Sequence, residues 1–496
     1  MDRRLRIGLI VVVVLALAYP AAAWLIGWSV QRQWQQAEQL QIEPFPSLTI
    51  AKTDYRRGVY GSTEEVTYMI GGGLVKSLQA MGQGWNGQFT VRHIIHHGPF
   101  PQLRDFAPAT VDTEFVIPPQ ARAMMAKALG DKAGLTIHTR VKWFGGSTTM
   151  IHAPAFHQQV EGAGDVDWRG LEAKIELGRE VGSRVVELTS PGMVMKTPKI
   201  DFSYENLAAN IDSRRVFEVL NTGTAKLSLG RFTIDSPATN FKLDTQGLVL
   251  DSKSSTDGDF LNGGVVISMN RLDGGKFSAS QMTLEVQTNH LHAPSMATLT
   301  KDIRAVQADQ AQALAASPAD PSAIAQQNAQ TTQQLIQAFQ TSGLQLLGHE
   351  PVIEFPRLGF KTPDGDFLLS LKLAVPGITP ADVNGDPNAL KMVFLKYLQA
   401  TINVRMDSAL FDKLSQQMAS DPDKSAATKA QLQQMEAQGY VKVDGQALTT
   451  LVTFMNGQLR VNGLPFAPTP PPPPPPAVPP PGQGHKPLPG QRRNPH

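Results

Sequence analysis

Hydrophobic and polar residues alternate over most of this chain, in short runs separated by Gly, Pro, Asn and Asp. The pattern extends from Phe45 to about His292, and an example is the alternation of Val111, Thr113, Phe115 and Ile117. Alternation of this kind is typical of a β-strand that buries one face and exposes the other to water. It predicts a large domain of class α+β that is β-rich, an antiparallel meander with helical insertions.

Three runs between Lys196 and Asn289 change the parity of their apolar positions part-way along. The last apolar residue before each change and the first after it are Leu229 and Phe232, Leu243 and Leu248, and Ala279 and Met282. A one-residue shift would otherwise turn the apolar side chains to the opposite face, so each change requires a bulge or a tight turn. We expect long, bent strands here.

The composition of residues 293–345 differs, because Ala, Gln and Ser dominate and aliphatic residues are scattered. This is typical of helices with a narrow apolar stripe, and a flexible insertion is the alternative. Alternation returns at Ile353–Val375, and apolar residues at helical spacing follow over residues 390–418. The predicted organisation is a β-rich domain over residues 46–292, the helical segment, and a mixed α+β part over residues 346–466.

A nearly uncharged apolar run, Ile7–Val30, follows three arginines close to the N-terminus. At ~1.5 Å per residue it is long enough to cross a hydrocarbon core of ~30 Å, and the arginines predict a cytoplasmic N-terminus. We expect a single transmembrane anchor over residues 1–30 and a linker over residues 31–45. The expected anchor residues are Ile7, Ile10, Val14, Leu17, Trp24, Ile26 and Trp28. A cleaved signal peptide is the alternative, because Ala21–Ala23 offers the small residues that cleavage requires.

Composition narrows the possible functions. The 496 residues are 41% hydrophobic, which is enough for a large core, and the net charge of +2 argues against a nucleic-acid partner. The absence of cysteine excludes disulfides, thiolate metal sites and a cysteine nucleophile. Residues 467–496 are rich in proline and predict a disordered tail, with a docking ligand in polyproline II form as the alternative.

The densest group of reactive side chains is a histidine cluster formed by His93, His96 and His97. In a strand, His93 and His97 would point to one face and His96 to the other. Two imidazoles on one face are potential zinc ligands, but a zinc site normally needs a third or fourth ligand and no HExxH motif is present. No motif of a serine hydrolase, phosphate-binding loop or calcium loop occurs. We therefore predict no catalytic, cofactor-binding or metal-binding residues and no cofactor.

Several segments resemble one known family when they are taken together. They are the N-terminal apolar run, Tyr55–Val66, His96–Phe100, Thr197–Tyr204 and Phe454–Phe466. This set is similar to the YdgA-type family of bacterial membrane-anchored envelope proteins of unknown function. The resemblance covers most of Met1–Phe466 and implies an inner-membrane protein with a periplasmic domain. It carries over no functional residues, because none is established for the family.

The leading functional hypothesis is a non-catalytic envelope protein whose bent sheet forms a scaffold or an apolar trough for a lipid or another hydrophobic ligand. An ordinary closed core is the alternative interpretation of the same apolar face. The second hypothesis is a protein interaction module or homo-oligomer. The third is a metal-dependent envelope hydrolase, which depends on the histidine cluster alone.

Overall fold

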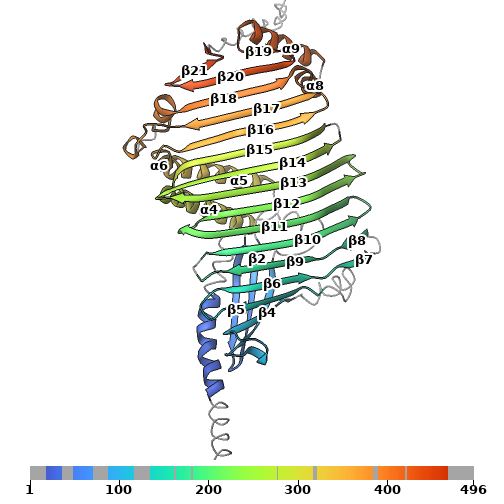
Figure 1. Ribbon diagram of the computed structural model, residues 1–496, viewed down its shortest axis with the longest axis vertical. Helices are drawn as coiled ribbons and strands as arrows, with labels where there is room; N and C mark the ends of the chain where they lie inside the picture. Colours follow the sequence, from blue (N-terminus) through green and yellow to red (C-terminus); the bar gives the residue numbers. More distant parts are fainter. Residues whose placement is uncertain are drawn as a thin grey trace, which may run out of the picture.

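The computed structural model describes residues 18–35, 48–70, 88–116, 134–160, 164–179, 182–275, 277–316, 321–383, 389–418 and 422–466. In Figure 1 the chain forms one long, stacked sheet with helices at its margins and behind it. The predicted proline-rich tail lies outside the described residues.

The first strands are β1 (Leu48–Arg57), β2 (Gly61–Ile70), β3 (Gln88–His97), β4 (Ala109–Val116), β5 (Thr136–Val141), β6 (Ser147–Ala153), β7 (Phe156–Val160), β8 (Gly164–Trp168), β9 (Leu171–Leu177), β10 (Arg184–Lys196) and β11 (Asp201–Phe217). The later strands are β12 (Leu220–Ser236), β13 (Phe241–Asp257), β14 (Phe260–Gly274), β15 (Phe277–His292), β16 (Val352–Thr362), β17 (Gly365–Ala374), β18 (Gln399–Asp407), β19 (Lys442–Asp444), β20 (Ala447–Met455), β21 (Gln458–Val461) and β22 (Leu464–Pro465). The helical elements are a helix over residues 18–35, η1 (Pro101–Leu103), α4 (Ala293–Ala316), α5 (Pro321–Ala338), η3 (Phe339–Gly343), α6 (Leu344–Leu347), η4 (Pro380–Val383), α7 (Ala389–Met392), η5 (Val393–Tyr397), α8 (Ser408–Met418) and α9 (Pro422–Ala437).

The described strands join one antiparallel sheet, which confirms the prediction of a β-rich meander. Strands β1 to β6 pair in chain order, β6 pairs with β9, and β9 to β18 continue in order. The hairpin β7–β8 joins through β8 to β10, and β20 follows β18. The sheet therefore runs without a break through the predicted domain boundaries near residues 292 and 346.

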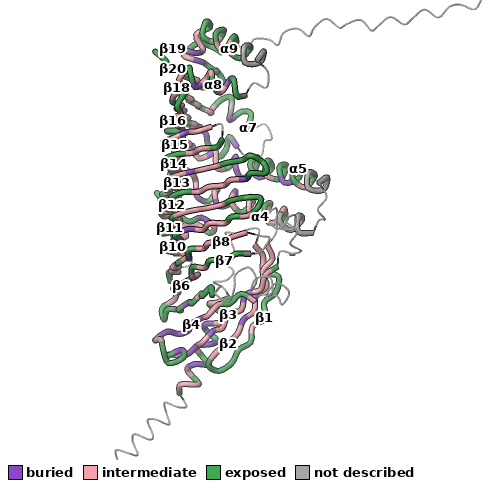
Figure 2. The backbone as a smooth tube through the Cα atoms, turned by 90° about the vertical axis from the view of Figure 1, so that its right-hand side faces the viewer, coloured by how far each residue is buried: buried purple, intermediate pink, exposed green. Residues whose placement is uncertain are grey.

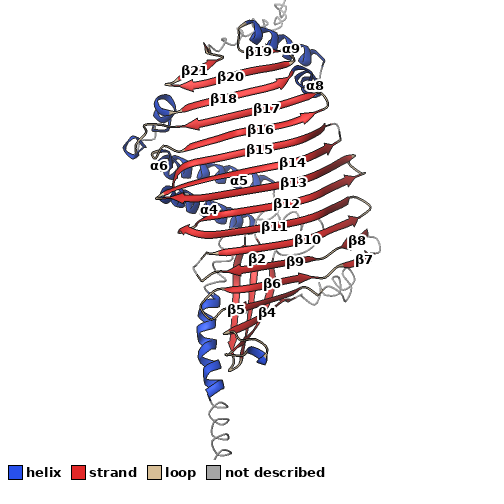
Figure 3. Cartoon of the chain, in the orientation of Figure 1, coloured by secondary structure: helices blue, strands red, loops and turns tan. Residues whose placement is uncertain are grey.

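The sheet is strongly twisted along its length. Strands β10 to β18 lie one above another in Figure 1, whereas β2 runs steeply behind β9 and β6, below β10. Figures 2 and 3 show α4 and α5 on one side of the sheet, behind the strands in the view of Figure 3. Right-handed twist of this kind accumulates from strand to strand in an open sheet.

The predicted parity changes arise from one row of kinked residues across five strands. The row consists of Asn206, Gly230, Gly247, Asn270 and Gln281, and the paired residues on either side keep the same register. Asn206, Gly247 and Gln281 have positive φ angles of 54°, 65° and 50°. A residue in this region interrupts the regular alternation of a strand, so apolar positions of opposite parity can continue on one face.

The helical segment packs on the sheet near the start of α4. Ala293 and Ala297 form a buried cluster with Leu220, and Leu261 packs against it. Because Leu261 lies six positions from Ile267 on β14, both side chains point to the same face of the strand. The helices α4 and α5 therefore lie on the face of the sheet to which Ile267 belongs.

The expected transmembrane helix is wrong. No helix in the described part of the chain is long and apolar enough to cross a membrane, so the proposed inner-membrane location with a cytoplasmic N-terminus and a periplasmic domain loses its support. The described helix over residues 18–35 instead packs on the sheet, because Val30 is buried against Ile95 and Val111 and Ile26 joins this cluster.

The remaining anchor residues divide into two groups. Trp24 and Trp28 lie on the helix over residues 18–35 and are 47% and 51% exposed, whereas Ile7, Ile10, Val14 and Leu17 lie outside the described residues. An apolar run has the same composition whether it packs on a sheet or crosses lipid, which is why hydropathy alone misled the prediction.

Candidate functional site: an apolar face and a buried histidine cluster

A continuous row of apolar side chains crosses the sheet from β10 to β18. Directly paired residues of neighbouring strands point to the same face, so the row can be followed from pair to pair. We call it the apolar ladder. It consists of Leu188, Ala209, Leu227, Leu250, Ile267, Leu284, Leu358, Leu369 and Val404.

The apolar ladder is not sealed by a second layer of the described structure. None of its nine residues is buried, and Leu227 and Leu358 are 39% and 36% exposed. In an ordinary sheet domain such a row would be the centre of a closed core, with side chains almost completely buried. Here the buried residues lie mainly near the margins of the sheet, beneath the helix over residues 18–35 and around α4 and α6.

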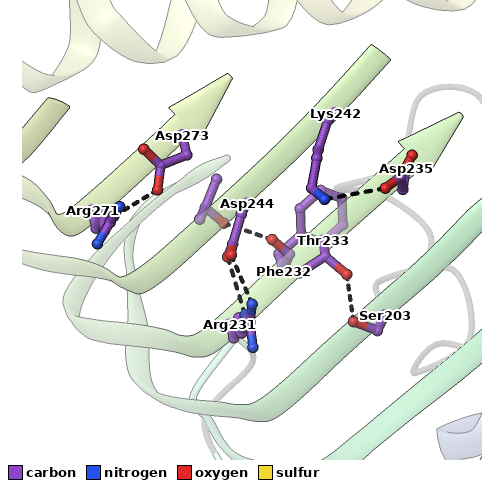
Figure 4. A network of polar contacts seen from close by, with 10 residues as sticks. Ser203, Arg231, Phe232, Thr233, Asp235, Lys242, Asp244, Arg271 and Asp273 are labelled. Atoms are coloured by element: carbon purple, nitrogen blue, oxygen red, sulfur yellow. Dashed lines mark hydrogen bonds and ion pairs between the residues drawn. The ribbon is translucent and has the colours of Figure 1, made fainter. Parts of the chain in front are cut away.

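Positions alternating with the apolar side chains carry paired charges. Figure 4 shows the part of this polar face on β11 to β14, where Arg231 donates two hydrogen bonds to Asp244, of 3.1 and 2.7 Å. The Arg231 hydrogen bonds hold the pKa of Asp244 below its ordinary value. Arg271 and Asp273 form a second pair at 2.6 Å. The two faces of the sheet therefore differ in chemistry, and only one offers a continuous apolar surface.

The apolar ladder continues through β9, β6 and β5 into a polar cluster. From Leu188 the pairs run to Ala173, Ile151, Ile137, Thr113, His93 and Glu64. His93 is 8% exposed and Glu64 is completely buried. The helix over residues 18–35 lies over this end, and the Trp34 ring meets the His93 ring edge-on at 5.2 Å.

The structure confirms the predicted orientation of the three histidines. His93 and His97 point inward, whereas His96 points to the other face, where its Nε2 lies 3.7 Å from Asp112. His97 Nδ1 lies 3.0 Å from the Ala23 carbonyl oxygen, and its Nε2 lies 3.1 Å from Ser62 Oγ. Because a carbonyl only accepts, Nδ1 carries the hydrogen, and Nε2 accepts from the Ser62 hydroxyl in the neutral ring.

Both inward histidines favour the neutral form. Burial lowers the pKa of His93 to about 4. Burial also lowers the pKa of His97, although its hydrogen bond to Ala23 acts in the opposite direction. Among the described residues, no group of three or more His, Asp or Glu side chains is arranged to hold a metal ion. The histidine cluster instead attaches the helix over residues 18–35 to β2 and β3.

Sequence reasoning missed Glu64, the most buried carboxylate of the cluster. The strand β2 alternates correctly, with Ser62, Glu64 and Val66 buried. However, Glu64 and Glu65 are adjacent, and charge alone does not show which of them points inward. The apolar residue Val66, two positions after Glu64, was the available signal.

A separate hollow of about 380 Å³ lies on the outer face of β1 to β3, remote from the ladder. It is lined by Asp54, Arg56, Thr63, Glu65, Arg92 and Ile94. Its charges are already paired, with Arg92 2.8 Å from Glu65 and Arg56 2.9 Å from Asp54. We therefore assign the hollow to the ion-paired surface of this hairpin.

The sequence matches a family described as "Bacterial protein of unknown function (DUF945)". The match extends over residues 1–469, which is nearly the whole chain. The chain belongs to the DUF945 family. No curated protein and no solved structure gives a significant match. DUF945 membership agrees with the bacterial origin that the resemblance implied and assigns no activity.

Proposed function

We propose that this DUF945 chain is a non-catalytic binding scaffold that holds a lipid acyl chain, or a similar hydrophobic ligand, along the apolar ladder. The observation that carries the proposal is the row of nine apolar side chains on nine consecutive strands, none of them buried. Within the family we further propose that the chain is of the YdgA type, on the basis of segments such as Tyr55–Val66 and Phe454–Phe466.

The dimensions of the ladder support an elongated ligand. Eight strand spacings of ~4.8 Å separate its ends, a length of ~38 Å. Burial contributes about 0.8 kcal/mol per methylene, so about ten methylenes on the ladder would contribute about 8 kcal/mol before the cost of association. The ladder itself contains no polar side chain, and a hydrocarbon chain needs none.

The test compares ligand binding between two variants with matched exposure. Leu227→Gln together with Leu358→Gln changes two ladder residues that are 39% and 36% exposed. Val266→Gln is the control, because Val266 is 40% exposed and pairs with Asp251 and Glu285 on the polar face. Binding of a fluorescent fatty acid to the purified chain is the measurement.

We expect the ladder variant to bind about tenfold or more weakly than the wild type, and the Val266→Gln variant to bind equally well. Equal binding by the wild type and the ladder variant would refute the proposal, as would no binding by the wild type. Circular dichroism of each variant verifies that the sheet is intact.

Self-association is a second proposal, favoured by the end of the sheet at β21 and β22. These short strands expose Leu459, Leu464 and the adjoining Phe466 by 37%, 45% and 38%. An edge with exposed apolar side chains is suited to pair with a strand of another copy. Light scattering of the purified chain tests this, and a monomer at all accessible concentrations would exclude it.

The hydrolase hypothesis receives no support from the histidine cluster. His93 and His97 are 8% and 1% exposed, and their hydrogen bonds go to Thr113, Ser62 and Ala23. A general base must reach a substrate proton, which these buried rings do not. We therefore keep the proposal of a non-catalytic scaffold.

A further inference from the structure

Large apolar side chains gather at the end of the sheet next to the helix over residues 18–35. Three connections meet there: the one between β1 and β2, the one between β3 and β4, and the one between β5 and β6. They lie side by side because the strand ends are paired, Gly61 with His96, His97 with Ala109, and Thr110 with Arg140. We call this group the aromatic tip. It consists of Tyr60, Phe100, Leu103, Phe106, Trp143 and Phe144.

The exposure of the aromatic tip is much higher than isolated surface residues require. Phe144 is 84% exposed, Leu103 is 82% exposed and Phe106 is 60% exposed. Single exposed apolar residues are common in proteins, but a contiguous group marks a surface that contacts a protein or a lipid.

The aromatic tip is held in a defined arrangement. Phe106 contacts Phe100 with ring centroids 5.4 Å apart and Trp143 with centroids 5.2 Å apart. Tyr19 stacks on Tyr60 at 5.9 Å and donates a 2.8 Å hydrogen bond to the Phe100 carbonyl. These contacts join the three connections to the helix over residues 18–35, so the exposed rings are not independent loop residues.

The backbone also presents Leu103 to solvent. Gln102 and Leu103 have positive φ angles of 51° and 58°, a region that side chains other than Gly, Asn and Asp rarely adopt. Strained residues of this kind persist when the surrounding structure holds them and cluster where function depends on them. Here the strain accompanies the display of a leucine whose side chain is 82% exposed.

The charges around the aromatic tip are mainly positive. Arg104, Arg140 and Lys142 lie in or beside the two longer connections and are exposed. Two carboxylates offset part of this charge: Asp105 lies between the cations, and Glu176 lies 3.6 Å from Lys142. Arg140 lies 3.9 Å from Asp105. Arg57 lies over the ring of Trp24 at 4.8 Å. Aromatic rings beside arginine and lysine suit the boundary of an anionic lipid surface, where rings insert and cations meet headgroups.

We propose that the aromatic tip docks peripherally on the surface of an anionic phospholipid bilayer. The contact involves loop side chains only and needs no helix that spans the bilayer. It goes beyond the proposed binding scaffold, because the tip and the apolar ladder share no residue. A protein partner is the alternative outcome of the test; the aromatic and cationic composition favours lipid.

The test is flotation of the full chain with vesicles of phosphatidylcholine alone or mixed with phosphatidylglycerol. The test variant combines Leu103→Ser, Phe106→Ser and Phe144→Ser. Phe241→Ser is the control, because Phe241 is 50% exposed and begins β13, away from the tip. A second variant, Arg104→Gln with Lys142→Gln, removes two charges and keeps the rings.

We expect the wild type and Phe241→Ser to float with the mixed vesicles, and the triple variant to bind about tenfold or more weakly. The charge variant should lose the preference for phosphatidylglycerol, and added salt should weaken wild-type binding. No flotation of the wild type, or equal flotation of all variants, overturns the proposal. If the wild type does not bind vesicles and the triple variant differs from it in oligomeric mass, the aromatic tip contacts protein instead of lipid. The fatty-acid assay is separate, so failure of one proposal does not imply failure of the other.

Discussion

His97 connects the helix over residues 18–35 to β2 through both of its ring nitrogens, one bonded to the Ala23 carbonyl and the other to Ser62. The helix has no side chain at Gly27, and a Cβ atom there would meet the imidazole ring of His97. His93 occupies the inward position four residues before His97, with Thr113 as its hydrogen-bond partner. The sequence predicted that both rings share a face. It did not predict that a helix covers them, because that contact joins residues 74 positions apart.

Substitution of Gly27 by alanine should lower stability. A Cβ atom at this position would lie 2.6 Å from His97 Cε1. Glycine to alanine in a helix normally stabilises by about 0.5–1 kcal/mol, whereas overpacking costs about 1–3 kcal/mol, so the clash should dominate. Urea denaturation measures the difference. In a His97→Ala background the same substitution should lose its penalty, and an equal penalty in both backgrounds would contradict this explanation.

Protonation of His93 should destabilise the fold. Its pKa is about 4 in the folded chain and 6.5 ordinarily, so the unfolded chain binds more protons between these values. The contribution is present above pH ~6.5 and is lost as the pH falls towards ~4, a difference of about 3 kcal/mol. Denaturation at several pH values measures it. The variant His93→Gln should show a flatter pH dependence, and an unchanged dependence would contradict the assignment.

At the scale of elements, the row of kinked residues from Asn206 to Gln281, which we call the kink row, is the feature that the sequence predicted most closely. The parity changes around Gly230 and Gly247 predicted irregular strands, and the structure places them in one line from β11 to β15. The sequence could not show that the irregularities align, because alignment depends on the register of every intervening strand pair. The separate bulges or turns that we expected are in fact one continuous kink.

Gly247→Ala should destabilise the chain more than Gly275→Ala. The two glycines have nearly equal φ angles of 65° and 66°, so both substitutions incur the same backbone cost of about 1–2 kcal/mol. A Cβ on Gly247 would also clash with the side-chain amide of Asn270, whereas a Cβ on Gly275 has no neighbour within 4 Å. We expect an additional loss of about 1–3 kcal/mol at Gly247, measured by chemical denaturation. Equal losses would show that the kink row is not tightly packed.

At the scale of the whole molecule, one sheet presents two chemically distinct faces. Charged pairs such as Arg231 and Asp244 occupy one face, and the apolar ladder from Leu188 to Val404 occupies the other. The helices α4 and α5 lie on the ladder side and leave its residues at least partly exposed. This arrangement is the basis of the proposal that a hydrophobic ligand binds along the apolar ladder.

A bound ligand should stabilise the whole chain. Any molecule that binds the folded state raises its stability by RT ln(1 + [L]/Kd), which is about 2.7 kcal/mol at one hundred times Kd. We expect a saturating fatty acid to raise the Tm of the wild type and of Val266→Gln. The variant Leu227→Gln with Leu358→Gln should show a much smaller shift, and an equal shift would place the ligand elsewhere.

Four features could be predicted from the sequence: the β-rich antiparallel character, helices after residue 293, the parity changes, and the opposite orientations of His93 and His96. These properties depend on residues a few positions apart, whose periodicity is visible in one dimension. The other features depend on contacts between residues far apart in the sequence. The ladder exists because separate hairpins set compatible registers. The helix over residues 18–35 covers the sheet because β3 to β5 offer its apolar residues a matching surface. Local hydropathy was the same for either outcome of that segment, so only long-range packing distinguished them.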